Sequence, residues 1–238
     1  LASLDLEGLQ LRLSVLREQR PDPFYTFPFL DELHRKYELD ARYFFLLADR
    51  GRYDLNPSPR QPQLRALIRQ LSRHHRTGIH PSYRSNDQPD LLAREIGRLE
   101  DITGQPVRDS RQHFLRLRLP DTYRRLLAAG IRTDYSMGYA DAAGFRAGTA
   151  HPFFWYDLQR EAATTLRVVP FQVMDGTLKN YLRLRPEQAL EHLAPIIAES
   201  RKTGGYFCTL WHNSSFSSIS GWKGWKPVYE ELVRQLAG

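Results

Sequence analysis

The chain has 238 residues, 41% of them hydrophobic and 26% charged, which is an ordinary globular composition and argues against wholesale disorder. Its net charge of +7 makes nucleic acid a partner to consider, but the arginines are scattered among acidic residues, so we expect solvated helix faces and no nucleic-acid partner. No apolar run is long enough to span a bilayer, and no signal-like leader precedes Leu1, so we expect a cytoplasmic protein. Because the sequence begins at Leu1 rather than at a methionine, an upstream segment stays open.

The N-terminal part of the sequence predicts two helices and then a strand. Leu4–Arg20 places leucines at helical spacing, and a second helix is expected over Pro23–Tyr37. Arg42–Leu47 is a continuous aromatic and aliphatic run, typical of a strand buried on both faces, and it leads into the polar loop Asp49–Asp54.

Helices and strands alternate over the rest of the chain, which we expect to form a single domain over residues 1–238. Helices are predicted at Leu64–His75, Asp87–Leu99, Leu119–Leu127, Pro186–Lys202 and Pro227–Leu236. Strands are predicted before His80 and at Val107–Phe114, Ile131–Tyr135, Leu166–Val173 and Gly205–Leu210, with a loop or short strand pair within Gly138–Asp157. This alternation predicts a largely parallel sheet, and six or seven strands suit a closed or nearly closed barrel. A doubly wound nucleotide-binding sheet is the weaker alternative, because no glycine-rich phosphate loop follows an early strand.

Three histidines follow predicted strand ends: His80, His113 and His212. In a parallel barrel the loops after the strands gather at one face, so we expect these side chains to share one site. Neutral imidazole is a common zinc ligand, and its pKa near neutrality suits proton transfer. The alternative is that each histidine only bonds a backbone group at its strand end. The remaining histidines are expected on the surface, namely His34, His74, His75, His151 and His192.

Carboxylates and guanidinium groups also lie near predicted strand ends. Asp134 and Asp175 could ligate a metal, act as a base, orient a histidine or cap the following loop. Arg111 and Arg146 lie among aromatic residues and glycines, where a guanidinium could hold a carboxylate or stabilise an oxyanion, and structural ion pairs are equally compatible.

The remaining candidate functional residues are two aromatic residues and the single cysteine. Tyr83 and Trp211 would suit stacking on sugar rings, although most aromatic residues in any chain belong to the core. Cys208 lies inside an apolar run, which indicates a buried small hydrophobic residue rather than a nucleophile.

Six short motifs, spread over nearly the whole chain from Asp22 onward, are similar to those of a known family. They are Gly78–Asn86, Ser110–Phe114, Asp134–Gly138, Gly144–Gly148, Met174–Leu178 and Leu210–Asn213. Together they resemble the NodB-type polysaccharide deacetylase superfamily, and more closely a divergent bacterial branch of it. The resemblance implies a distorted (β/α)7 barrel, a divalent metal that is usually zinc, and hydrolysis of N- or O-acetyl groups on carbohydrate polymers.

The resemblance also implies roles for single residues. His80 matches the first histidine of the family's His-x-x-x-His metal motif, but Arg84 stands in place of the second and cannot ligate zinc. His113 is therefore the candidate for the other ligand. Arg111 resembles the arginine of the groove-lining motif, and His212 resembles the histidine of the final motif, which acts as general acid.

The family's first strand ends in an aspartate motif that supplies a base and a metal ligand, and nothing in Leu1–Arg20 resembles it. Either this sequence lacks that strand, ahead of an N-terminal helix in residues 1–20, or the protein has lost the chemistry.

We expect a metal-dependent, carbohydrate deacetylase-like hydrolase acting on a polysaccharide or glycan precursor. The alternative is a non-catalytic carbohydrate-binding barrel, and a nucleic-acid-binding protein is weaker still. Expected metal ligands are His80 and His113, expected catalytic residues His212, Asp175 and Arg111, and expected substrate contacts Tyr83, Arg146, Trp211 and Asp134.

Overall fold

A six-stranded and a two-stranded sheet form the centre of the computed structural model, which describes residues 6–219 and 221–237. The larger sheet contains, in spatial order, β1 (Arg42–Phe45), β2 (Arg76–Ile79), β3 (Asp109–Ser110), β4 (Thr133–Asp134), β6 (Ala162–Val168) and β5 (Phe153–Asp157). The smaller sheet pairs β7 (Val173–Met174) with β8 (Thr209–Leu210). Every pairing is parallel except that of β5 with β6, which forms an antiparallel hairpin within the segment predicted as a loop or strand pair.

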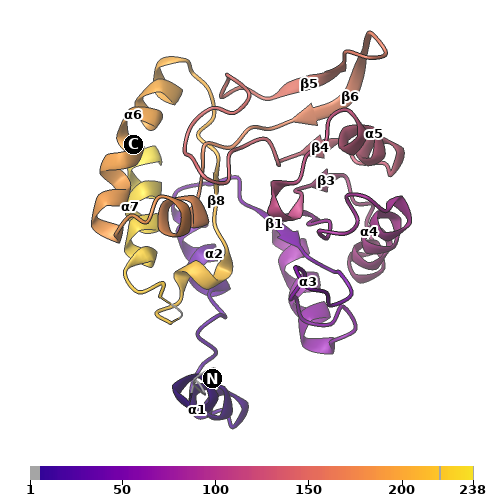
Figure 1. Cartoon of the computed structure of the whole chain (residues 1–238). Helices are drawn as coiled ribbons and strands as arrows, with labels where there is room; N and C mark the ends of the chain where they lie inside the picture. Colours follow the sequence, from indigo (N-terminus) through magenta and orange to yellow (C-terminus); the bar gives the residue numbers. More distant parts are fainter. Residues whose placement is uncertain (1–5, 220, 238) are drawn as a thin grey trace.

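Helices follow most of the parallel strands, as the alternating sequence pattern predicts. They are α2 (Phe27–Lys36), α3 (Pro62–His74), α4 (Pro89–Thr103), α5 (Asp121–Ala128), α6 (Pro186–Lys202) and α7 (Trp225–Ala237). Figure 1 shows α3, α4 and α5 beside the larger sheet and α6 and α7 beside β8, while α1 (Leu6–Leu16) extends away from the rest. The mixed α/β fold with a distorted parallel barrel is confirmed, although its wall is not continuously hydrogen-bonded within the described residues.

β1 takes the first position in this barrel. Counted from β1, the described residues supply seven parallel strands without any strand from upstream of α1. The first carboxyl-terminal loop of the barrel is therefore the one that leads from β1 to α3, and it contains Asp54.

Several predicted strands are longer than the observed ones, and two of them differ most clearly. Leu166–Val173 was predicted as one strand, but β6 ends at Val168 because Pro170 has no N–H group to continue the pairing. Val107–Phe114 was also predicted as one strand, but β3 is short and the chain turns into a 3-10 helix at His113–Leu115. Phe114 and Leu115 have left-handed backbones there, with φ of 56° and 51°, which an extended strand cannot contain.

Gly78 allows β2 to lie close to both of its neighbours. A Cβ atom at this position would be 2.6 Å from the carbonyl oxygen of Asp109 and 2.7 Å from the ring of Phe44. A residue without a side chain is therefore needed. The close approach sets Ile79 level with Ser110 and leads directly into His80.

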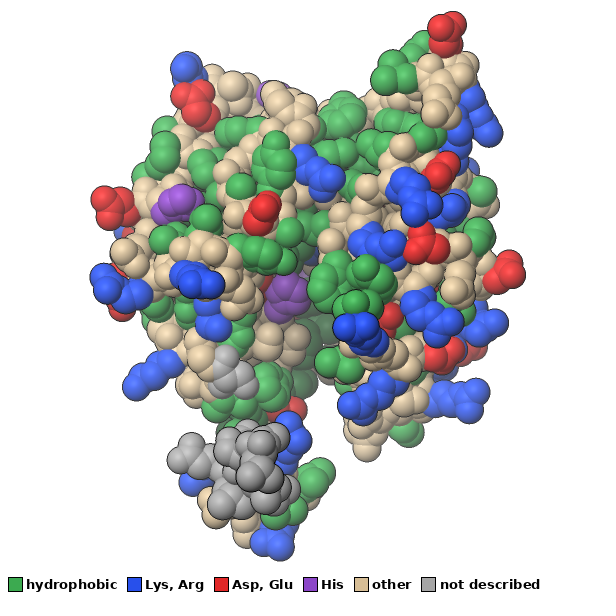
Figure 2. Space-filling view, viewed as in Figure 1, with side chains coloured by type: hydrophobic (Ala, Val, Ile, Leu, Met, Phe, Trp, Pro, Cys, Tyr) green, Lys and Arg blue, Asp and Glu red, His purple; other side chains and the backbone are tan. Residues whose placement is uncertain are grey.

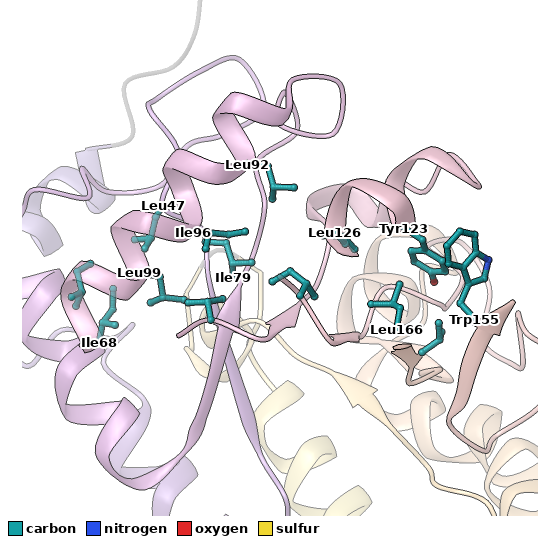
Figure 3. Packing of buried hydrophobic residues seen from close by; sticks show 14 residues of the cluster. Leu47, Ile68, Ile79, Leu92, Ile96, Leu99, Tyr123, Leu126, Trp155 and Leu166 are labelled. Carbon is teal, nitrogen blue, oxygen red and sulfur yellow. The ribbon is translucent and has the colours of Figure 1, made fainter. Parts of the chain in front are cut away.

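The largest core cluster lies between the six-stranded sheet and α3, α4 and α5 (Figure 3). On α4 the buried residues Leu92, Ile96, Leu99 and Ile102 recur every three or four positions, so one face of the helix is apolar. Gly104 ends this helix in a left-handed conformation. Full burial of each such side chain stabilises the fold by about 1.5–3 kcal/mol.

A second group of helices covers the smaller sheet. Leu193 on α6 and Leu232 on α7 pack with Val173 of β7, while α2 packs against α7. His34, which was expected on the surface, is 7% exposed and its Nε2 lies 2.7 Å from the hydroxyl of Tyr229, so that prediction is wrong. No helix in residues 6–219 and 221–237 has the length and apolarity to cross a membrane, as expected from the sequence.

Candidate functional site

A cavity of about 840 Å³ opens beyond the carboxyl ends of the strands, and all three predicted histidines line it. His80 directly follows β2, His113 lies in the 3-10 helix after β3, and His212 directly follows β8. The ring centroids of His80 and His113 are 5.0 Å apart. Figure 2 shows one face of the molecule hollowed between two halves, with a histidine side chain and hydrophobic side chains in the hollow.

His80 and His113 are each held through the same ring nitrogen. Nδ1 of His80 lies 2.5 Å from the carbonyl oxygen of Arg111, and Nδ1 of His113 lies 2.8 Å from Oδ1 of Asp54. A carbonyl or carboxylate oxygen only accepts hydrogen bonds, so Nδ1 carries the proton in both rings. Nε2 of each ring is then a lone-pair nitrogen, and it has no hydrogen-bond partner among the described residues.

Both rings stay neutral at physiological pH. Burial, together with a smaller effect of the neighbouring His113, lowers the pKa of His80 to about 3. Burial also lowers the pKa of His113, and this outweighs the opposing effect of Asp54. A neutral imidazole with a free Nε2 can ligate a metal or accept a proton.

His212 is held differently, by a fully buried carboxylate. Oδ1 of Asp175 lies 2.8 Å from Nδ1 of His212 and 2.6 Å from the backbone nitrogen of Gly176. Oδ2 accepts from the backbone nitrogen of His212 at 2.7 Å and from the hydroxyl of Ser215. Burial lowers the pKa of His212, but the hydrogen bond and the charge of Asp175 together outweigh burial, so the net direction is upward.

Asp175 is thus an orienting residue. It is 0% exposed and all its hydrogen bonds are to its own loop and to the loop after β8, so it does not line the cavity. Of the roles considered from the sequence, this placement favours orienting a histidine over acting as a base.

Asp54 is a candidate site residue that the sequence interpretation missed. Its carboxylate is 2% exposed, and besides His113 it accepts the backbone N–H of Tyr83 at 2.9 Å. It lies in the loop after the first strand of the barrel, which is where the resemblance places an aspartate. The order of the predicted strands contains this information, because Arg42–Leu47 is the first of them and Asp54 lies in the loop that follows it.

Arg111 lies between the cavity and the interior of the barrel. Its guanidinium packs over the ring of Phe44 at 4.5 Å and forms no hydrogen bond or ion pair with the described residues. Burial lowers its pKa.

The predicted aromatic contacts lie at and near the cavity. Trp211 lines it and stacks on Phe216. Tyr83 does not line the cavity, but it packs against Tyr53 and against the exposed Phe114, which does. Together the three rings form an aromatic cluster beside His113.

Two other predicted substrate contacts are used inside the protein. Asp134 is 0% exposed, and its carboxylate accepts hydrogen bonds from Ser110 and Ser136. Arg146 donates to the carbonyl of Gly138 at 3.0 Å. Neither residue lines the cavity, so both have structural contacts in this conformation.

The described residues do not contain a ready-made group of three or more histidine, cysteine, aspartate or glutamate side chains for a metal ion. The donors at His80 and His113 nevertheless have the right chemistry. Metal-binding histidines commonly donate the other ring N–H to a carbonyl or a carboxylate, which is the arrangement of both rings. The donor set therefore fits an ion held by two imidazoles, with Asp54 as the adjacent carboxylate.

The sequence matches no family model and no curated protein. The fold matches a crystal structure from Mycobacterium smegmatis described as a candidate polysaccharide deacetylase, with a TM-score of 0.62, 15% identity, and coverage of 98% of this chain and 77% of that one. Two crystal structures of mutants of a CE4 family pseudoenzyme, one with restored enzymatic activity, have TM-scores of 0.48 and 0.47 at 13% and 12% identity. They cover 90% and 91% of this chain, which spans 60% of each of them. The chain therefore has the NodB-type polysaccharide deacetylase fold, and that prediction is confirmed at the level of the fold.

Proposed function

We propose that this protein is a metal-dependent hydrolase that removes an N- or O-acyl group from a carbohydrate. The observation that supports this best is the orientation of the three imidazoles. Each donates Nδ1–H to a fixed oxygen, so three Nε2 atoms are left for one cavity. The fold shared with a candidate polysaccharide deacetylase agrees with the proposal.

His80 and His113 would hold a divalent ion such as zinc through Nε2, and Asp54 would orient His113 through Nδ1. When bound, the ion would polarise the carbonyl oxygen of the acyl group as a Lewis acid. Arg84 is exposed and outside the cavity, so it does not compete for this position.

His212 would be the general acid. Its raised pKa keeps a proton on the ring to a higher pH than in a free histidine, and Asp175 fixes Nδ1–H so that Nε2 donates. A water molecule would add to the acyl carbon and give its proton to the solvent, and protonation of the leaving nitrogen or oxygen by His212 would break the C–N or C–O bond and release the acid. The aromatic cluster of Tyr53, Tyr83 and Phe114 lies beside His113 and offers ring faces to a neighbouring sugar.

The test is to measure zinc content and acetate release with the purified chain. Acetylated chitooligosaccharide and acetylated xylan would be the substrates, before and after chelation and after zinc is restored. His80→Ala should abolish zinc binding and acetate release, because it removes a ligand whose Nε2 faces the cavity. His192→Ala is the matched control, because His192 is exposed on α6.

Two results would refute the proposal. One is acetate release that survives both chelation and His80→Ala. The other is a chain that binds oligosaccharide but takes up no zinc and releases no acetate, which would establish the non-catalytic carbohydrate-binding barrel instead.

A further inference from the structure

A second cavity, of about 630 Å³, extends to the first residues of β1 and β2 and is not lined by His80, His113 or His212. It is lined by Arg42 and Arg76, the first residues of β1 and β2, and by Arg167, which lies level with the first residue of β4. The two cavities adjoin and share part of their lining, including Arg42, Tyr43, Arg111 and Trp211.

Positive charge dominates this second cavity. The acidic residues that line it are Glu38 and Asp40, and Asp40 is already paired with Arg42 at 2.9 Å. Asp109 lies 3.7 Å from the same arginine. Against these stand five lining arginines, which are Arg42, Arg76, Arg111, Arg167 and Arg201.

Unpartnered polar atoms are concentrated here as well. Eight buried side-chain nitrogen or oxygen atoms lack a hydrogen-bond partner among the described residues, and five of them belong to residues that line the second cavity. These five are Nδ1 of His34, Nε of Arg42, the hydroxyl of Tyr43, Nε of Arg111 and Oγ of Ser200. A buried polar group without a partner destabilises the fold, and the arginine and hydroxyl groups among them are donors. Donors without acceptors indicate that an acceptor is missing.

Arg111 is the strongest case. Burial lowers the pKa of Arg111 and the negative charges of Asp134 and Asp175 act to raise it, but neither carboxylate forms an ion pair with its guanidinium. Both carboxylates accept hydrogen bonds from other groups instead. A buried guanidinium without a direct counter-ion is costly unless a ligand supplies the negative charge.

We propose that the second cavity binds a small oxyanion, a carboxylate or a phosphate, with Arg111 and Arg42 as its main contacts. The planar guanidinium matches such oxygens in pairs. Both arginines also line the first cavity, but the anion site does not depend on the metal or the acyl chemistry proposed above.

The test is to titrate the full-length chain with inorganic phosphate and with acetate, at constant ionic strength set by sodium chloride, and to follow binding by calorimetry. Arg111→Met should raise the Kd by about tenfold or more, because it removes a charged hydrogen-bond donor. Arg42→Met should weaken binding too, which keeps the test valid if one variant fails to fold. Arg69→Met removes the same charge from an exposed position on α3 and should leave the Kd unchanged. The oxyanion that binds more tightly identifies the ligand class.

Alkylation of Cys208 in the unsubstituted protein tests which of the two cavities holds the bound anion. It is the single cysteine, it is partly exposed, and it lines the second cavity but not the first. A saturating oxyanion should slow its alkylation by neutral iodoacetamide, while acetamide at the same concentration should not. The proposal is overturned if neither anion binds saturably, or if binding is lost in His80→Ala while Cys208 alkylation stays unaffected, since the anion would then occupy the first cavity.

Discussion

Replacing Asp175 with asparagine tests the orientation of the general acid most directly. The carboxylate takes two donors on each oxygen, and an amide keeps only one accepting oxygen. With the amide oxygen kept toward Nδ1 of His212, the hydroxyl of Ser215 can rotate to accept from the new NH2 group, but the backbone N–H of His212 loses its acceptor. One buried donor left unmet costs about 1–3 kcal/mol, so we expect a loss of stability of that size.

The loss of stability caused by Asp175→Asn should depend on pH, and the pairing of Asp175 with His212 determines whether the loss is larger at low or at high pH. Asp175 raises the pKa of His212 in the folded state above its unfolded value. The pair therefore stabilises the fold fully below the unfolded pKa, and this contribution disappears as the pH rises through the folded pKa. Urea denaturation should show a larger destabilisation by Asp175→Asn at pH 5.5 than at pH 9. In NMR titrations the pKa of His212 should fall in the variant.

Activity gives the third measurement. A positioned general acid contributes about 10²–10⁴-fold, so kcat should fall within that range while KM changes little. Asp157→Asn is the control, because Asp157 is also buried but is paired with Arg124, away from the cavity. The reasoning is refuted if Asp175→Asn leaves the pKa of His212 unchanged and destabilises the protein equally at both pH values.

Three further changes have defined outcomes. Gly78→Ala should destabilise the chain by about 1–3 kcal/mol in urea denaturation, since its Cβ would meet the backbone of Asp109, whereas Gly97→Ala on α4 meets nothing within 4 Å and should stabilise by about 0.5–1 kcal/mol. Burial lowers the pKa of His34 to about 4, so its contribution to stability should fall by about 2 kcal/mol between pH 7 and pH 5, and His34→Phe should remove that part of the slope. Asp54→Ala should weaken zinc binding by about 10–100-fold by equilibrium dialysis, and unchanged affinity would exclude Asp54 from the site.

The sequence predicted the features that depend on short stretches of chain. The alternating helices and strands, and the placement of His80 and His212 directly after strands, follow from local hydrophobic patterns. The lengths of β3 and β8 could not be predicted, because strands of two residues are defined by their neighbours and not by their own pattern. Pro170 was visible in the sequence and should have divided the predicted strand, so that error lay in the interpretation.

The protonation states of the site could not be predicted, because they depend on contacts between distant residues and on how burial balances those contacts. Asp54 and His113 are 59 residues apart, and Asp175 and His212 are 37 apart. Both pairs join a carboxylate oxygen to Nδ1 at 2.8 Å, yet the pKa of His113 is lowered and that of His212 is raised. In His113 burial outweighs the hydrogen bond and charge of Asp54, whereas in His212 the hydrogen bond and charge of Asp175 together outweigh burial, so the two pKa values shift in opposite directions. The balance between burial and the carboxylate therefore separates two similar histidines into a ring favoured in the neutral form that suits a metal and a ring that keeps its proton to a higher pH, as suits a general acid.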